Sequence, residues 1–380
     1  MNDIKNSGNS QIDLLEDEIN AKAKEIYTES LSMSIGEVAN MYKENELELQ
    51  PEYQRFFRWS NMQKTKFIES ILLGIPIPPF FMYQKQDGVL AVIDGLQRLS
   101  TILQFMDILE IKDDREEIEE FKLFGTDFLP SLSGKTWNGS NSITTQRKLI
   151  FKRARIDIRI IKYSSDVDAQ YELFQRLNTG GSSLTEQEVR NSLMIMENNE
   201  FFNKFESASK NIDFKECLPL SKRSIDEKED MEYALRYLVY RNIDIDKDIK
   251  GNEDIGEFLN DQMFKLLRDS EYNIDYEIEL FKKVFNNLNE VLADDSFKKF
   301  DVLKNKFVGP VSISLYEAIV PGFSSYLEKN EGYIDKEVLR DKLIKISSDS
   351  QYEEKKIAHR PIQRLKQLLK FSEEYFNDEC

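Results

Sequence analysis

The feature that most constrains the fold of this chain is a change in the spacing of its apolar residues. Over residues 153–161 they alternate with polar ones, placing Ala154, Ile156, Ile158 and Ile160 on one face and Arg153, Arg155, Asp157 and Arg159 on the other. A period of two predicts a half-buried strand with a basic outer face. Beyond about residue 198 apolar residues recur every three or four positions, over 255–267, 274–292 and 362–371. That spacing predicts helices.

The residues between 60 and 108 predict a helix, a hairpin and a second helix. Ser60 and Gln63 form a capping-box pattern, and Gly74 marks the end of the first helix. Residues 80–83 and 90–93 flank Asp87-Gly88, a pair typical of a β-hairpin. Helical spacing resumes over residues 95–108. The sequence Asp94-Gly95-Leu96-Gln97-Arg98 is therefore predicted to lie on a strand-to-helix turn.

These patterns together predict an α+β fold in which a small mixed sheet precedes an all-helical C-terminal domain. Further helices are expected over residues 13–30 and 166–178, up to about residue 152, and from Thr185, which forms a capping-box pattern with Glu188. At 380 residues and 40% apolar content the chain is long enough for two domains. We divide it into an N-terminal helical extension over residues 1–30, a mixed domain over 31–197 and a helical domain over 198–380.

The composition of the chain argues against secretion and membrane insertion and excludes several kinds of catalytic chemistry. The N-terminus lacks the layout of a signal peptide and no apolar run reaches roughly 18 residues, so a cytoplasmic protein without membrane contact is expected. Cys217 and Cys380 are too few and too far apart for a disulfide framework or a cysteine zinc site. His359 is the single histidine, which excludes serine triads and histidine-metal nucleases within this chain. Any metal would have to bind carboxylates.

The strand-to-helix turn at residues 94–98 carries the most specific candidate site. It places a carboxylate (Asp94), an amide (Gln97) and a guanidinium (Arg98) around a helix N-terminus, where unpaired N–H groups favour an anion. Gly95 and Thr101 belong to the same turn and helix and are candidate nucleotide-binding residues. A phosphate fits this arrangement. The alternative is an ordinary tight turn in which Asp94 caps the helix.

Two further segments contain residue types that bind nucleotides. Residues 53–59 interleave two arginines with four aromatic residues, which suits phosphate contact beside base stacking; their candidate ligands are Tyr53, Gln54, Arg55 and Arg58. Residues 177–191 form a glycine-rich junction between two predicted helices, with candidates Asn178, Thr179, Gly180, Arg190 and Asn191. The alternatives are an aromatic core segment and an ordinary helix end with a turn.

These segments together resemble a known family. The matching motifs are Tyr53-Gln54-Arg55, Trp59, residues 67–79, residues 93–101, residues 174–181, residues 184–191, Arg223 and residues 231–236. In this order and spacing they resemble domain-of-unknown-function family 262, the N-terminal domain of GmrSD-type modification-dependent restriction enzymes, within the ParB/sulfiredoxin-like superfamily. The resemblance covers roughly residues 30–240.

The resemblance implies a bacterial nucleotide-binding and hydrolysing protein of a restriction or antiphage defence system. Carried over by position, Asp94, Gln97 and Arg98 form the core of the site, the residues from Tyr53 lie beside it, and residues 178–181 lie near the phosphates or the base. Leu96 stands where many members carry Gln, and Ser100 where many carry Thr. The histidine-metal nuclease domain that follows in the restriction enzymes has no counterpart in this sequence.

Two other patterns are weaker candidates for binding sites. Gly134-Lys135-Thr136 resembles part of a phosphate-binding loop, but the first glycine of that motif would fall at Leu129. Residues 146–162 carry seven basic residues against one acid, which could form a DNA track through Arg153, Arg155 and Arg159 or a solvated face. The net charge of −17 favours the solvated face.

The sequence therefore predicts a nucleoside triphosphatase in which Arg98, Arg55 and the helix N-terminus neutralise phosphates while Asp94 binds Mg²⁺ or positions water. The alternative is a nonenzymatic DNA-binding or sensor module that recruits a separate nuclease subunit. Direct nuclease action through carboxylate-bound metal has least support, because no dense carboxylate cluster stands out. The sequence leaves open whether the chain forms a homo-oligomer.

Overall fold

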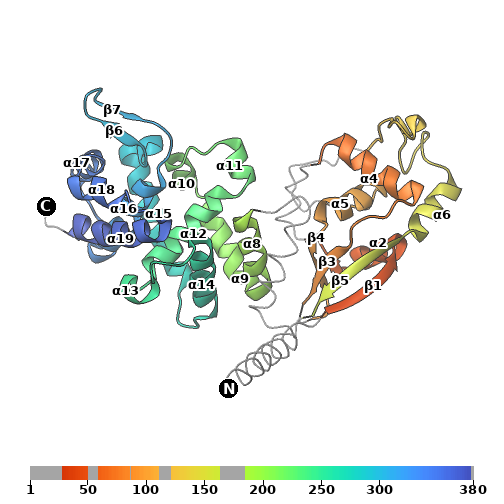
Figure 1. Ribbon diagram of the computed structural model, residues 1–380, viewed down its shortest axis with the longest axis horizontal. Helices are drawn as coiled ribbons and strands as arrows, with labels where there is room; N and C mark the ends of the chain where they lie inside the picture. Colours follow the sequence, from red (N-terminus) through yellow and green to blue (C-terminus); the bar gives the residue numbers. More distant parts are fainter. Residues whose placement is uncertain (1–27, 50–58, 86, 111–120, 163–184, 378–380) are drawn as a thin grey trace, which may run out of the picture. The chain divides into compact units, whose positions relative to one another are not determined.

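The computed structural model describes residues 28–49, 59–85, 87–110, 121–162 and 185–377. The chain divides into two compact units, residues 1–183 and residues 184–380 (Figure 1). The division falls before helix α8 (Glu186–Glu197), whereas the sequence predicts a boundary after it. We describe each unit separately.

The N-terminal unit is built on a five-stranded mixed sheet, as predicted. Its strand order is β1-β5-β3-β4-β2. The alternating segment forms β5 (Arg155–Ile161), which pairs antiparallel with β1 (Thr28–Ser34) and parallel with β3 (Phe80–Gln84). The predicted hairpin is formed by β3 and β4 (Leu90–Asp94), and β2 (Leu47–Glu48) runs parallel to β4. Burial explains why apolar and polar residues alternate along β5. One face of the strand is buried and the other is exposed: the buried residues are Ile156, Ile158 and Ile160, and the exposed ones are Arg155, Asp157 and Arg159.

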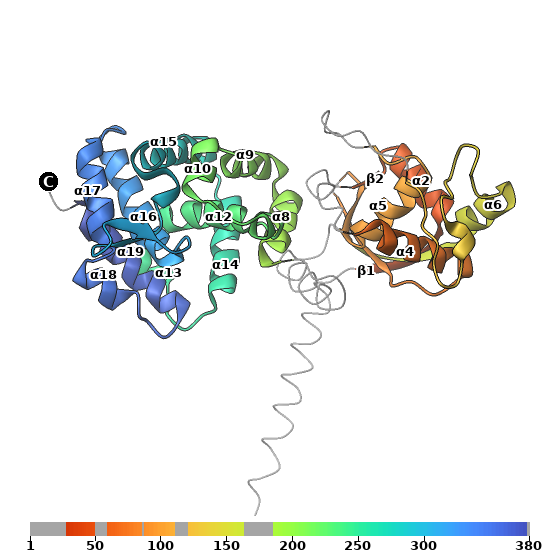
Figure 2. The same ribbon diagram turned by 90° about the horizontal axis from the view of Figure 1, so that it is seen from above.

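Helices pack their apolar residues against this sheet to make one core. They are α2 (Ile35–Lys43), α4 (Asn61–Leu73), α5 (Leu96–Phe105) and α6 (Thr145–Arg153) (Figure 2). The predicted capping box of Ser60 and Gln63 starts α4, and Gly74 ends it in the left-handed conformation. A triangle of rings closes the core, with centroids 5.5–5.6 Å apart among Phe105, Trp137 and Phe151. Such edge-to-face pairs hold α5 and α6 together.

Two predictions for this unit need correction. Residues 28–30 belong to strand β1 and not to a helix over 13–30, so the helical extension assigned to residues 1–30 is wrong at its end. The rest of that predicted helix lies outside the described residues, as does the helix predicted over 166–178. Arg153 is the last residue of α6, and β5 starts two positions later.

The second unit is mostly helical, as the three- and four-residue spacing predicts. Its helices in the described part of the chain are α8, α9 (Asn199–Ser209), α10 (Ile212–Cys217), α11 (Lys222–Asp226), α12 (Glu229–Arg241), α13 (Ile245–Asp248), α14 (Ile255–Arg268), α15 (Ile274–Leu292), α16 (Ile313–Lys329), α17 (Lys336–Ile346), α18 (Ser350–Lys355) and α19 (Pro361–Asn377). The predicted capping box of Thr185 and Glu188 starts α8.

Buried aromatic rings and one close helix crossing hold this unit together. Phe214, Phe281 and Phe285 are fully buried, and the rings of Phe281 and Phe285 lie 4.5 Å apart. Helices α16 and α19 cross at Gly322, where a Cβ atom would lie 2.0 Å from the carbonyl oxygen of Ser372. Only glycine permits this approach.

The prediction of an all-helical second domain is corrected by a β-hairpin. Strands β6 (Lys299–Asp301) and β7 (Lys306–Val308) pair antiparallel and project from the helices (Figure 1). The rings of Phe300 and Phe307 pack 5.0 Å apart, and the N–H of Phe300 donates to the Ser347 hydroxyl at 3.1 Å. The hairpin is therefore anchored at its base.

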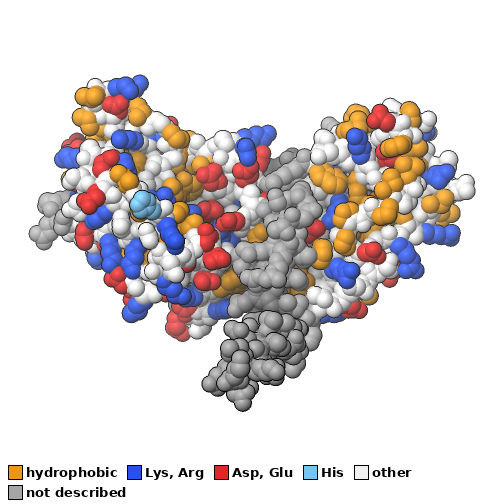
Figure 3. Space-filling model, in the orientation of Figure 1, with side chains coloured by type: hydrophobic (Ala, Val, Ile, Leu, Met, Phe, Trp, Pro, Cys, Tyr) orange, Lys and Arg blue, Asp and Glu red, His pale blue; other side chains and the backbone are white. Residues whose placement is uncertain are grey.

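Among the described residues, no helix combines the length and the apolar character that crossing a bilayer requires. The face of the helical unit seen in Figure 3 carries acidic and basic side chains side by side. No field of a single sign therefore dominates this face.

Candidate functional site

The candidate site lies where β4 ends at Asp94 and α5 begins at Leu96, so the predicted strand-to-helix turn is confirmed. Gly95 makes the turn with φ of 95°, in the left-handed region. A Cβ atom on Gly95 would lie 2.6 Å from Cδ1 of Phe80 in the neighbouring strand. Both the backbone angle and the close approach therefore require glycine.

Arg98 is held in place by its neighbours. Its Nη2 donates to Oδ2 of Asp94 at 2.9 Å, and its Nη1 donates to the carbonyl oxygens of Pro78 and of Pro79, the latter at 3.2 Å. The guanidinium lies over the ring of Phe80, 4.7 Å from its centroid. Burial lowers the pKa of Arg98 and the charge of Asp94 partly offsets this, but an arginine stays charged at neutral pH.

These contacts separate the roles of the two charged residues. The Arg98 side chain is 11% exposed and that of Asp94 is 44% exposed. Arg98 orients the carboxylate and ties the turn to the proline segment before β3, while Asp94 faces solvent. The sequence predicts Asp94 and Arg98 as site residues, but it does not predict that the carbonyl oxygens of Pro78 and Pro79 and the ring of Phe80 hold Arg98. The one indication is that residues 75–79 belong to the motif that resembles the family.

The start of α5 carries no side-chain cap, so the alternative in which Asp94 caps the helix is wrong. An uncapped helix start presents the N–H groups of its first turn to an anion. Within that turn Oε1 of Gln97 is buried without a hydrogen-bond partner. A buried acceptor without a donor costs free energy, so its retention needs an explanation, such as a ligand that donates to it.

Thr101 is fully buried one turn further along α5. Its hydroxyl donates to the carbonyl oxygen of Gln97 at 2.6 Å. The predicted direct contact between Thr101 and a nucleotide is therefore not supported, because the side chain faces the core and its hydroxyl already has a partner.

Asp94 supplies the single carboxylate of residues 94–98. Within the described ranges, no group of three or more His, Cys, Asp and Glu side chains could hold a metal ion. Mg²⁺ at nucleotide sites commonly takes one or two carboxylates, with phosphate oxygens and waters completing its coordination. The single half-exposed carboxylate of Asp94 fits a Mg²⁺ ion that arrives with a nucleotide, and does not fit a site made by protein side chains alone.

Several predicted ligands lie outside the described residues. These are Tyr53, Gln54, Arg55 and Arg58 before α4, and Asn178, Thr179 and Gly180 before α8. Their roles stay predictions.

Arg190 and Asn191 lie on α8 in the helical unit. The Arg190 side chain is 1% exposed, and its five N–H groups face five acceptors: Asn260, Gln187, Glu232, Glu186 and the carbonyl of Gly256, at 2.8–3.5 Å. Asn191 is buried and accepts from Gln187 at 2.9 Å. Direct phosphate contact by Arg190 is therefore not supported, because no donor remains for it.

The basic outer face predicted for the strand is present. Arg153, Arg155 and Arg159 are all exposed at the end of α6 and along β5. Arg155 donates to the carbonyl of Ser32 at 3.3 Å, and Arg159 donates to the hydroxyl of Ser30. Asp157 lies exposed between them on the same strand and reduces the local charge.

Other candidate groups are ordinary structural residues. Lys135 donates to Asn141 at 2.8 Å within a loop, and Thr136 is buried, so Gly134-Lys135-Thr136 does not form a phosphate loop. Burial raises the pKa of the Cys217 thiol to about 12, which keeps it protonated and unreactive. His359 is exposed just before α19.

The fold and the turn together define a small α+β domain in which a mixed sheet carries an uncapped helix start beside a fixed carboxylate–guanidinium pair. Residues 35–195 match the family model described as the GmrSD restriction endonuclease, N-terminal domain. The chain thus carries a GmrSD N-terminal-like domain, which confirms the resemblance seen in the sequence and relates this part of the chain to restriction systems. No curated protein and no solved structure matches the chain significantly.

Proposed function

We propose that the turn at residues 94–98 binds the phosphates of a nucleoside triphosphate and that the chain hydrolyses it within a restriction or antiphage defence system. The observation that carries the proposal is the uncapped start of α5 beside Asp94 and Arg98. The match to a restriction-endonuclease domain supports the biological setting.

Phosphate binding follows from the helix start and the guanidinium. The N–H groups of the first turn of α5 donate to phosphate oxygens, and the helix dipole favours their charge. Arg98 adds a fixed positive charge whose position is set by Pro78, Pro79 and Phe80. Because Arg98 is mostly enclosed, it acts on the phosphates through the field of its charge and by holding Asp94.

Hydrolysis requires a water to form a bond to the terminal phosphorus while the bond to the bridging oxygen breaks. A Mg²⁺ ion bound together with the nucleotide would neutralise part of the phosphate charge. The exposed carboxylate of Asp94 binds that ion or orients the attacking water, and Arg98 keeps the carboxylate in one direction. The buried Oε1 of Gln97 accepts a hydrogen bond from the bound ligand. The activity that we propose is therefore that of a nucleoside triphosphatase.

Asp94→Asn and Gln97→Met test this function. Each is expected to lower phosphate release from the preferred nucleotide, among ATP, GTP, CTP and UTP with Mg²⁺, by about tenfold or more. The asparagine keeps the shape and can still accept from Arg98, but it lacks the charge. The methionine removes a buried acceptor that has no partner, so this variant should unfold at the same temperature or a higher one while binding nucleotide less tightly.

The matched control is Asp127→Asn, which changes an exposed carboxylate elsewhere in the same unit and should leave phosphate release unchanged. Undiminished release by Asp94→Asn, or no release by the native chain from any of the four nucleotides, would exclude this function.

The second candidate function is a DNA-binding module that recruits a separate nuclease subunit. It is favoured by the exposed arginines at residues 153, 155 and 159, since phosphate contacts come mostly from such side chains.

This alternative predicts binding of duplex DNA that weakens steeply with salt. The double variant Arg155→Gln and Arg159→Gln should lower the slope of log affinity against log salt by about 2, about one unit for each phosphate that the variant no longer neutralises. Arg223→Gln, at an exposed arginine of the helical unit, is the control and should leave the slope unchanged. Absent or salt-insensitive binding would remove this alternative.

A further inference from the structure

The tip of the β6–β7 hairpin exposes apolar residues among lysines. Leu303 is 98% exposed and Val302 is 65% exposed, so most of both apolar side chains is left uncovered by the described part of the chain. Lys299, Lys304 and Lys306 lie on the same hairpin with Asp301, giving three positive charges against one negative. The base is anchored by the Phe300–Phe307 ring pair and by the hydrogen bond from Phe300 to Ser347. We call residues 302–306 the hairpin tip.

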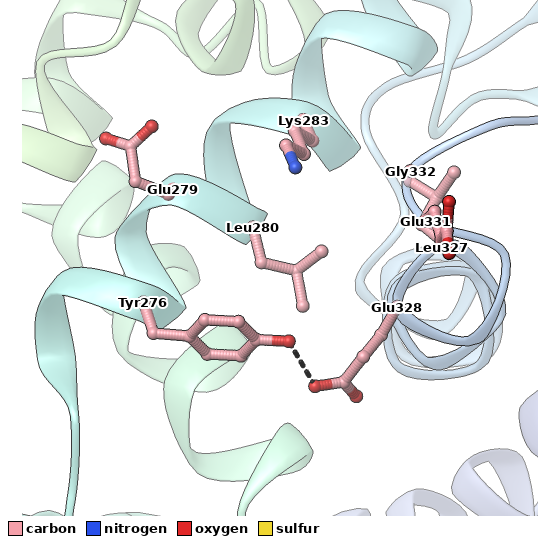
Figure 4. Close-up of a pocket in the computed structure, with 8 residues that line it drawn as sticks. All are labelled: Tyr276, Glu279, Leu280, Lys283, Leu327, Glu328, Glu331 and Gly332. Atoms are coloured by element: carbon pink, nitrogen blue, oxygen red, sulfur yellow. Dashed lines mark hydrogen bonds between the residues drawn. The ribbon is translucent and has the colours of Figure 1, made fainter.

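A pocket of complementary character lies on the same helical unit. It has a volume of about 320 Å³ and lies between α15 and the end of α16 (Figure 4). Leu280 and Leu327 supply apolar lining, and Tyr276 donates to Glu328 at its edge with a distance of 2.6 Å. Three carboxylates, Glu279, Glu328 and Glu331, and one ammonium, Lys283, also line it. Glu328 is already paired with Arg241 at 3.2 Å, so Glu279 and Glu331 are the carboxylates offered to a second molecule. We call this the α15–α16 pocket.

We propose that the hairpin tip of one chain docks into the α15–α16 pocket of a second copy. The apolar side chain of Leu303 fits the pocket, since a cavity of about 150 Å³ already holds a benzene-sized group. The lysines of the tip then meet the carboxylates of the pocket. The charges are opposite on the two surfaces, which favours this pairing over association of like surfaces.

Two lysines of the hairpin, Lys304 at its tip and Lys299 at its base, can change partners on docking. Lys304 pairs with Asp301 at 3.1 Å and Lys299 with Glu353 at 3.7 Å, both with lysine side chains more than half exposed. Exposed pairs of this kind contribute little, so exchanging them for carboxylates of the second copy costs little. Burying Leu303 and Val302 supplies the apolar part of the association.

The interface is head-to-tail, because each chain offers one tip and one pocket that differ from each other. Such an interface closes into a ring if its rotation permits and otherwise extends into a chain of copies. A variant with a damaged tip should therefore lose self-association but keep an intact pocket. A variant with a damaged pocket should likewise lose self-association but keep an intact tip.

Sedimentation velocity of the full chain tests this proposal with a tip variant and a pocket variant. Leu303→Asp places a charge at the tip, and Glu279→Lys with Glu331→Lys reverses two charges of the pocket. The native chain is expected to associate as concentration rises and to dissociate with salt. Each variant alone should associate at least about tenfold more weakly. Ile212→Ser, at another exposed apolar residue of the same unit, should associate like the native chain.

Mixing the two variants gives the decisive measurement. The pocket of the tip variant and the tip of the pocket variant remain intact, so an equimolar mixture should form one-to-one dimers and nothing larger. A native chain that stays monomeric at every soluble concentration, variants that associate like the native chain, or a mixture that stays monomeric would each overturn the proposal. Loss of DNA binding by Leu303→Asp without native self-association would also overturn it, in favour of nucleic acid as the partner.

Discussion

Replacing Arg190 by methionine is expected to lower the free energy of unfolding of the helical unit by about 3–5 kcal/mol. The guanidinium is 1% exposed and joins α8 to α12 and α14 through Glu232, Asn260 and the carbonyl of Gly256. Methionine fills much of the same space but donates no hydrogen bond. Removing one member of a buried ion pair leaves the remaining charge and acceptors without compensation, which costs more than the pair itself contributes.

The two tryptophans allow this effect to be assigned to one unit. Trp59 and Trp137 both belong to the N-terminal unit, so their fluorescence reports its unfolding, whereas far-ultraviolet circular dichroism is dominated by the many helices of the second unit. In urea, Arg190→Met should move the dichroism transition to lower concentration and leave the fluorescence transition in place. A shift of fluorescence alone would mean that α8 stabilises the N-terminal unit instead.

Arg223→Met is the matched control for Arg190. Arg223 is 85% exposed and pairs with Glu227 one turn away on the helix surface, so its replacement should not measurably change either transition. A shift as large as that of Arg190→Met would show that the buried network is not the cause.

Replacing Arg190 by methionine should also change how the stability of the helical unit depends on pH. Burial alone would raise the pKa of Glu232, but the charges of Arg236 and Arg190 outweigh it and hold the pKa below its usual range. Stability from Glu232 is therefore present above the pKa of the unfolded chain and is lost as pH falls through the lower pKa of the folded chain. Without Arg190 the folded pKa lies higher, so the contribution is smaller and is lost at a higher pH.

Local signals in the sequence identify the helix starts and the candidate turn. Capping boxes depend on residues three apart, and both of those predicted, at Ser60 and Thr185, are present. The Asp94-Gly95 turn is also predictable, because a glycine between a strand and a helical pattern indicates a sharp local bend. Such features depend on neighbours in the sequence and not on the rest of the fold.

Features that depend on distant partners do not show in the sequence. Strand β1 owes its existence to pairing with β5, with Ser30 opposite Arg159, and its first residues fall within a helix that the sequence predicts. Strands β6 and β7 span three residues each and depend on a ring pair and a hydrogen bond to Ser347. Short strands have too few residues for a periodic signal to stand out.

The distant contacts of the candidate site could not be predicted from the sequence either. The sequence predicts Arg98 as a phosphate ligand, but its partners at Pro78, Pro79 and Phe80 lie about twenty positions earlier in the chain. Arg190 belongs to the glycine-rich motif, yet its five acceptors come from three different helices. Which arginines remain available to a ligand is decided by tertiary contacts, which one sequence does not reveal.

Replacing Glu317 by leucine is the second substitution expected to cost about 3–5 kcal/mol of unfolding free energy in the helical unit. Glu317 lies fully buried on α16 and accepts from Nε and Nη2 of Arg364 at 2.9 and 3.1 Å. Arg236 approaches it at 3.8 Å from α12. Leucine leaves two guanidinium groups in a largely enclosed space, and Arg236 keeps Glu232 and the Tyr240 hydroxyl as partners among the described residues.

Three further variants show how much of this loss comes from the charge of Glu317 and how much from the shape of its side chain. Glu317→Gln keeps an acceptor for Arg364 and should cost less than leucine. The double variant Glu317→Leu with Arg364→Leu removes both charges and should recover part of the loss, because a hydrophobic pair can replace a buried ion pair. Glu373→Leu, at an exposed glutamate of α19, is the control and should leave the urea midpoint unchanged.

Because Glu232 and Arg236 connect Arg190 to Glu317, the two predicted losses should not add. Arg190 and Glu317 belong to one chain of ion pairs that runs from α8 through α12 to α16 and α19, and Glu232 and Arg236 lie between them. Once one end is broken, Arg236 and Glu232 can reorient toward each other, so the double variant Arg190→Met with Glu317→Leu should lose less than the sum of the single variants. Losses that add within about 0.5 kcal/mol would show two independent pairs and no connected network.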